Sequence, residues 1–185
     1  MPALATWAPE DGVLGAVAPL ALATTQPTAL VVDLDPGGPL YPSVRSLRKL
    51  VEEGPRAADL RPSRTGVALL ANGGIGTEDS REIVHLLLRG WPVVVLRLPP
   101  QAPDDVPAPV VPVRLLTPGG LFPGRGRAVY QPVALGPRPR RRPETDGSLV
   151  LPAAPRRVVR ALLEGTRPVA SRWATAWRRV WATTW

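Results

Sequence analysis

Short apolar runs rich in β-branched residues alternate along this chain with segments of helical periodicity, and this alternation constrains the fold more than any other feature. Strands that are apolar along nearly their whole length are typical of a parallel sheet covered on both faces. Two weaker runs contain Pro112 and Pro132, and because proline donates no hydrogen bond to a ladder, we expect both runs at sheet edges. The expected strands are residues 3–7, 29–34, 67–70, 92–98, 110–116 and 128–135.

Three helices are expected between the strands. Residues 13–23 are rich in Ala and Leu. Residues 43–53 begin with Ser43, a good N-cap, and have an apolar face at helical spacing. Residues 77–89 open with two acids and close at a glycine. We therefore predict an α/β protein with a small, mostly parallel sheet of about five or six strands, flanked by helices and followed by a C-terminal amphipathic helical extension.

Charge and composition divide the chain into three parts. We expect an α/β domain over residues 1–135, a Pro/Arg-rich linker over 136–154 and a basic, Trp-rich helical tail over 155–185. Residues 1–136 balance 12 basic against 12 acidic side chains, whereas residues 137–185 hold 11 arginines and only three acids. Such asymmetry indicates a tail that meets something anionic, either nucleic acid or a membrane surface.

Several classes of site are excluded by composition. The chain has no cysteine and one histidine, His85, which rules out disulfides, thiolate metal sites, cysteine nucleophiles and a multi-histidine centre within one chain. We expect no cofactor and no metal. The longest apolar run, residues 13–23, is too short to span a bilayer, and no basic segment precedes it as in a signal peptide. A cytoplasmic location is expected.

The first two expected strands are followed by the segments that carry a family resemblance. Residues 9–16 read PEDGVLGA, and residues 30–38 read LVVDLDPGG. The second segment resembles the strand VLLIDLDPQG of the MinD/ParA family of deviant Walker-A ATPases, in which the loop K-G-G-x-G-K-[ST] follows the first strand. The order of elements over residues 3–98 is similar as well. The resemblance implies a P-loop-like fold with a nucleotide site at the carboxyl ends of the strands.

The residues that would bind a nucleotide in that family are largely replaced here. Glu10 stands for the first lysine, Gly15 for the second and Ala16 for the hydroxyl residue, while Ala71 stands where the Walker-B aspartate belongs. Without the lysine and the hydroxyl, phosphate charge and Mg²⁺ lose their ligands. The resemblance thus implies a non-catalytic, degenerate site, a pseudo-ATPase, whose positions are Glu10, Asp11, Gly12, Gly15, Ala16, Asp33, Asp35 and Ala71.

The pair Asp33 and Asp35 leaves three interpretations open. It is a polar strand end that feeds a turn, or a remnant of the family's geometry in which Asp35 matches the hydrolysis-linked aspartate, or a carboxylate pair for acid/base or metal chemistry. The last interpretation makes the protein a small enzyme and predicts that Asp35→Ala abolishes its activity.

Residues 168–185 place an apolar, Trp-bearing stripe on one face of a helix, with Val169 and Thr184 at its two ends. Such a face is suited to packing on the sheet or on a partner protein, to an anionic membrane interface, or to nucleic acid together with Arg138, Arg140, Arg141 and Arg142 and Arg156, Arg157 and Arg160. The residues expected to bind a membrane or partner are Arg172, Trp173, Trp177, Arg178, Arg179, Val180 and Trp181.

The function predicted from the sequence is that of a non-catalytic MinD/ParA-like adaptor or positioning protein. It would bind a partner protein and, through the Arg/Trp helix, the inner surface of the bacterial inner membrane, where it would be peripheral. The alternative is a nucleic-acid-associated protein that uses the Arg-rich C-terminal segment.

Overall fold

The computed structural model describes residues 2–38, 41–117, 120–121, 126–132, 147–166, 168 and 170–185. It is an α/β fold built on seven parallel strands in the order β3-β2-β4-β1-β5-β7-β8, with the short β6 antiparallel to β5. The predicted class is therefore confirmed, with slightly more strands than expected. The strands are β1 (Ala3–Trp7), β2 (Thr28–Asp33), β3 (Gly66–Leu70), β4 (Val94–Arg97), β5 (Val110–Thr117), β6 (Gly120–Leu121), β7 (Val129–Pro132) and β8 (Leu149–Val150).

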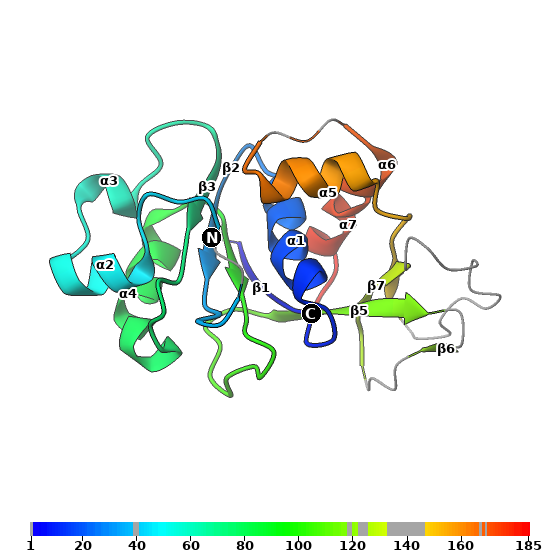
Figure 1. Ribbon diagram of the computed structural model, residues 1–185, viewed down its shortest axis with the longest axis horizontal. Coiled ribbons are helices and arrows are strands. Elements are labelled where there is room, and N and C mark those ends of the chain that lie inside the picture. Colours follow the sequence, from blue (N-terminus) through cyan, green and yellow to red (C-terminus); the bar gives the residue numbers. More distant parts are fainter. Residues whose placement is uncertain are drawn as a thin grey trace.

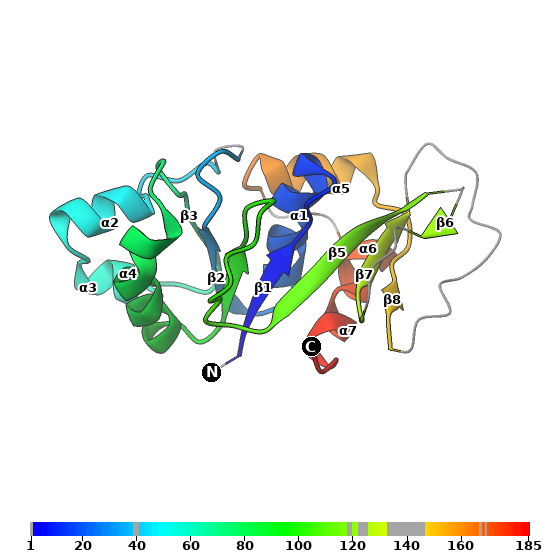
Figure 2. The same ribbon diagram turned by 90° about the horizontal axis from the view of Figure 1, so that it is seen from below.

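Helices cover the sheet on both faces, which gives three layers (Figure 1, Figure 2). One face carries α1 (Gly12–Ala23), and α5, α6 and α7 pack in the same hydrophobic cluster. The opposite face is covered over the β3-to-β1 half by α2 and α4. The remaining helices are α2 (Leu47–Glu53), α3 (Ala57–Leu60), α4 (Thr77–Gly90), α5 (Arg156–Leu163), α6 (Arg172–Ala176) and α7 (Arg178–Trp181).

The weaker strands differ from the prediction in their position. Pro112 and Pro132 lie in β5 and β7, and both strands are interior, between β1 and β8 in the sheet order. β5 pairs with β1 over residues 110–112 and with β7 from Val113 onward, so Pro112 stands where the pairing passes from one neighbour to the other. Pro132 is the last paired residue of β7. Neither proline interrupts the middle of a ladder, so an interior place is tolerated.

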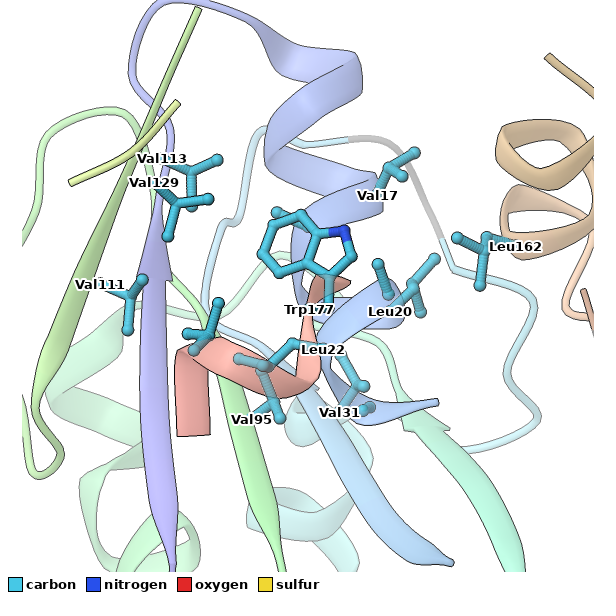
Figure 3. Close-up of a cluster of buried hydrophobic side chains, with 14 of the residues drawn as sticks. Val17, Leu20, Leu22, Val31, Val95, Val111, Val113, Val129, Leu162 and Trp177 are labelled. Atoms are coloured by element: carbon cyan, nitrogen blue, oxygen red, sulfur yellow. The ribbon is translucent and has the colours of Figure 1, made fainter. Parts of the chain in front are cut away.

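Two of the C-terminal tryptophans lie inside the protein. Trp173 and Trp177 are buried, with ring centroids 5.8 Å apart in an edge-on arrangement. Figure 3 shows Trp177 between α1, at Val17 and Leu20, and the strand residue Val95. The continuous helix expected over 168–185 is instead two short helices that meet at Trp177. Trp173, Trp177 and Val180 still share one face, and that face packs on α1 and the sheet.

Much of the region past residue 146 also belongs to this core. Leu149 and Leu151, from β8 and just beyond it, are buried, as are Val158 and Leu162 of α5. Val169 and the arginines 138 and 140–142 lie outside the described residues. In the part of the chain that the structure describes, no helix has the length and apolar character needed to cross a membrane.

Candidate functional site

The carboxyl ends of β2 and β4 hold a buried cluster of three charges. Asp33 and Arg97 end these two strands and stand opposite each other in the parallel register. The Arg97 guanidinium donates from Nη1 to Asp33 Oδ2 at 3.0 Å and from Nη2 to Asp35 Oδ2 at 2.7 Å. All three side chains are nearly inaccessible, with Arg97 at 3% exposure. Both carboxylates thus face one internal cation.

The turn after β2 closes over this cluster. Asp33 Oδ1 accepts the Asp35 N–H at 3.0 Å, and Asp35 Oδ1 accepts the Gly37 N–H at 3.0 Å. A Cβ at Gly38 would lie 2.2 Å from Arg97 Nη2, so only glycine lets the chain pass so near the guanidinium. The segment DLDPGG, residues 33–38, therefore forms a turn that covers the Arg97 guanidinium.

Burial sets the electrostatics of the cluster. Desolvation raises the pKa of Asp33 from 3.8 to about 6, with the charge of Asp35 adding to the shift, although Arg97 and the Asp35 N–H act in the opposite direction. The Arg97 Nε–H is also buried and has no partner among the described residues. With both carboxylates ionised the cluster carries a net charge of −1, held away from water.

Tyr41 connects the cluster to α1. The Arg97 Cζ lies 5.7 Å from the centre of the Tyr41 ring, within the range of a cation–π contact. The Tyr41 hydroxyl donates to the Ala16 carbonyl oxygen at 2.8 Å. Burial strongly raises the pKa of the Tyr41 phenol, which therefore stays protonated. Two of the positions predicted from the family resemblance, Ala16 and Asp33, are thus joined through Tyr41 and Arg97.

The two acidic side chains of the loop after β1, Glu10 and Asp11, both have partners within the protein. Asp11 is the N-cap of α1, and its Oδ1 accepts the Leu14 N–H at 2.7 Å. A carboxylate at this end complements the partial positive charge of the helix, which is the place and the sign that a phosphate would take. Glu10 forms an ion pair with Arg114 of β5, whose guanidinium lies over the Trp7 ring with its Cζ 4.7 Å from the ring centre.

The remaining positions predicted for the nucleotide site are Gly12, Gly15 and Ala71. Gly12 begins α1, and a Cβ there would meet nothing within 4 Å, whereas Gly15 is buried in the helix. Ala71 follows β3, and its carbonyl accepts the Leu47 N–H of α2 at 2.8 Å. Within the described residues, no group of three or more His, Cys, Asp or Glu side chains could hold a metal ion. A cation at Asp33 and Asp35 would first have to displace Arg97.

Arg97 and Tyr41 were missed by sequence reasoning. Arg97 is the single charged residue in the run PVVVLRL of residues 92–98, and an arginine in a strand buried on both faces needs a carboxylate partner. That signal predicts a buried ion pair for Arg97, but it does not identify Asp33 and Asp35 as the partners, because they lie more than 60 residues away in the sequence. Tyr41 carried no comparable signal because it lies in an irregular segment.

The predicted binding residues of the tail separate by exposure. Trp173, Trp177 and Val180 are buried, and Trp181 is half-buried. Trp173 Nε1 donates to Gln131 Oε1 at 2.6 Å, and Trp181 Nε1 donates to Thr25 Oγ1 at 3.0 Å. Only the arginines of the set, Arg172, Arg178 and Arg179, are exposed.

Comparisons with known proteins do not extend the family resemblance. No protein-family model matches the chain. No curated protein matches it either.

Proposed function

We propose that this protein is a non-catalytic binding protein, an adaptor or positioning factor of MinD/ParA-like type whose nucleotide site is closed by its own side chains. One observation carries the proposal: the Arg97 guanidinium occupies the space between Asp33 and Asp35 with two short hydrogen bonds. The Asp11 carboxylate supports it, because it caps the helix end where a phosphate would bind.

Opening this site for a nucleotide would be energetically unfavourable. A triphosphate would have to displace the Asp11 cap and bring its charge close to Glu10, while Mg²⁺ would have to compete with Arg97 for two buried carboxylates. Breaking a buried ion pair costs about 3–5 kcal/mol when one charge is left without a partner. The α/β fold would then serve as a rigid scaffold for surface contacts, and its partner would be another protein.

Nucleotide binding and hydrolysis test the proposal directly. A ligand at 100 times its Kd stabilises a folded protein by about 2.7 kcal/mol. We therefore expect millimolar MgATP to leave the melting temperature unchanged and to release no phosphate above the buffer rate. Saturable MgATP binding to the unmodified chain would contradict the proposal.

Binding to an anionic surface is the second candidate function, and the exposed arginines of α5 to α7 favour it. Arg156, Arg157, Arg172, Arg178 and Arg179 are all exposed and have no carboxylate partner among the described residues, while Arg160 pairs with Glu164 at 3.3 Å. Insertion of the tryptophans into a membrane would require α6 and α7 to leave the core, so contact through the arginines alone fits the fold better.

Co-sedimentation with anionic liposomes and a titration with duplex DNA test this candidate. Charge reversal of Arg178 and Arg179 should weaken binding to either target, and the affinity should fall steeply with salt. Trp181→Ala serves as the matched variant on the same helix. If only Trp181→Ala weakens liposome binding, and salt has little effect, the membrane contact is apolar and the arginine-based candidate fails.

A further inference from the structure

The outer edge of β3 is open along part of its length. Gly66 donates its N–H to Pro27 at 2.8 Å, toward β2, so the main-chain groups of the next residue, Val67, point away from the sheet. Leu69 agrees with this alternation, since its carbonyl accepts the Ser43 hydroxyl from outside at 2.6 Å. In the described part of the chain, nothing pairs with the outward N–H and C=O of Val67 or with the N–H of Leu69.

This edge forms the floor of a groove of ≈ 450 Å³. β3 itself has five residues, or about 16 Å at the usual rise of a strand. At the carboxyl end of β3 the groove is closed by the segment before α2, where the Leu47 N–H already bonds the Ala71 carbonyl. A short extended segment of three or four residues could therefore pair with the open half, and a longer strand could not.

The wall of the groove opposite β3 is held in place by hydrogen bonds and ion pairs. Trp91 Nε1 donates to the Asp59 carbonyl at 3.0 Å, and Arg45 bridges the carboxylates of Asp59, at 3.2 Å, and Glu53, at 2.7 Å. A Cβ at Gly90 would lie 2.0 Å from the Leu60 carbonyl oxygen, so α3 sits close against the end of α4. The groove is therefore preformed, which lowers the entropy lost on binding.

Among the described residues, the charged side chains that line the groove without an ion-pair partner are arginines. Arg61 and Arg64 line it and are exposed, and no carboxylate pairs with either of them among the described residues. The acids in the lining, Asp59 and Glu164, are already paired with Arg45 and Arg160. Val44 also lines the groove; it is 90% exposed and the most exposed of the large apolar side chains that the structure describes.

We propose that the open edge of β3 is a docking site for an extended, acidic segment of a partner protein, which joins the sheet as one further strand. The segment would pair with Val67 and the Leu69 N–H, place its carboxylates near Arg61 and Arg64, and cover Val44 with an apolar side chain. A second copy of this chain fits less well, because two such edges would bring Arg61 and Arg64 of both copies together. The proposal rests on the proposed function, since it assigns the surface by which the adaptor holds its partner.

The probe for the test is a synthetic peptide of alternating Val and Thr between terminal glutamates, labelled for fluorescence anisotropy. Its matched control has the same sequence with alternate backbone nitrogens methylated, so that it keeps its charge and loses the hydrogen bonds of a strand. We expect saturable binding of the first peptide, at least about tenfold weaker binding of the second, and slower exchange of the Val67 and Leu69 amides in the complex. Equal affinity for both peptides, or no saturable binding of either, would overturn the proposal.

Variants of the full chain separate strand pairing from charge. Val67→Pro removes an outward N–H that β2 does not use, and the double reversal Arg61→Glu and Arg64→Glu changes only exposed side chains. Each should weaken the peptide at least about tenfold, whereas the matched reversal Arg178→Glu and Arg179→Glu, on α7, should leave its affinity unchanged. If Val67→Pro fails to fold, as judged by circular dichroism, the arginine pair decides. Equal loss in both arginine pairs would show non-specific attraction and overturn the proposal.

The remaining outcomes are also decisive. Amide protection at Val67 that appears with protein concentration alone, together with a dimeric mass in light scattering, would assign the edge to a second copy and reject the acidic partner. Saturable MgATP binding would refute the proposed function while leaving the peptide result to stand by itself. Failure of the peptide in a chain that also ignores MgATP would refute the docking site alone.

Discussion

Arg97 and Asp33 end two neighbouring parallel strands, and a 3.0 Å hydrogen bond joins their side chains across the carboxyl edge of the sheet. In open α/β sheets this edge is where ligands bind. Here the space is filled from within, because the turn carrying Asp35 folds back over the guanidinium and Gly38 passes close to it.

Removing the cation should destabilise the fold strongly. Arg97→Met leaves Asp33 and Asp35 buried without a counter-charge, and we expect the free energy of unfolding to fall by about 3–5 kcal/mol. The triple variant Arg97→Met, Asp33→Asn, Asp35→Asn removes the charges together and should recover part of that loss. Urea denaturation of the three proteins measures it. A loss below about 1 kcal/mol in Arg97→Met would be typical of an exposed pair and would contradict the buried cluster.

The stability contributed by Asp33 should decrease as the pH rises. Its pKa is 3.8 when unfolded and about 6 in the folded protein, so between these values the folded state binds more protons than the unfolded state. By linkage, this group's contribution to the free energy of unfolding is largest below pH 3.8 and falls by about 3 kcal/mol as the pH passes through 6.

Asp33→Asn isolates this pH dependence, because every other group titrates in both proteins. We expect the stability of the unmodified chain relative to Asp33→Asn to fall between pH 4 and pH 7 in urea titrations, with the steepest change below the folded-state pKa of about 6. The opposite trend, a relative stability that grows with pH, would mean that Arg97 lowers the pKa of Asp33 and that desolvation does not dominate.

A methyl group at Gly38 should disturb the ion cluster. Its Cβ would lie 2.2 Å from Arg97 Nη2, and the guanidinium is held by two carboxylates and has little room to move. Gly38→Ala should lower the free energy of unfolding by about 1–3 kcal/mol, the usual cost of overpacking. Gly12→Ala is the control, since its Cβ meets nothing within 4 Å and should be neutral or stabilising by up to about 1 kcal/mol. Equal effects of both variants in thermal melts would argue against a tightly closed turn.

The two buried tryptophans differ in their indole N–H groups. Trp173 donates to Gln131 at 2.6 Å, whereas Trp177 Nε1 is buried without a partner among the described residues. Trp173→Phe leaves the Gln131 carbonyl oxygen without its donor, so it should cost about 1–3 kcal/mol more than Trp177→Phe. Chemical denaturation of both variants gives this difference. The reverse order would contradict this assignment, because it would mean that Trp177, and not Trp173, loses a hydrogen-bond partner on substitution.

Most of the sheet could be predicted from the local sequence, because its strands are short apolar runs rich in β-branched residues. The apolar runs at 3–7, 29–34, 67–70 and 92–98 correspond to β1, β2, β3 and β4, and the helices expected over 13–23 and 77–89 correspond to α1 and α4. The helix expected over 43–53 begins only at Leu47, as α2 with Ser46 as its N-cap, and α3 was not expected. The runs with prolines were placed at edges, which was wrong. The rule that proline lies at a sheet edge considers one strand alone. A proline is also tolerated where a strand changes from one pairing neighbour to the next, and that position depends on the register of three strands together.

The site and the tail required the three-dimensional structure. The carboxylates at Asp33 and Asp35 were identified from their motif, but their partner Arg97 lies more than 60 residues away, and only the strand order β2-β4-β1 brings it to them. In the tail, the sequence showed that Trp173 and Trp177 have helical spacing, but it did not show what packs against them. The spacing defines a face, and the packing on α1 decides whether that face is buried.

The Arg97 guanidinium itself gives the most direct test of the closed edge. In a ¹⁵N-labelled chain, its nitrogen-bound protons should give slowly exchanging NMR signals, since they are buried and bonded to two carboxylates. We predict that these signals keep their positions and exchange rates when MgATP is added to millimolar concentration. Signals that shift saturably with MgATP, or that exchange rapidly with water in the free protein, would contradict the account, because the edge would then be open to a ligand.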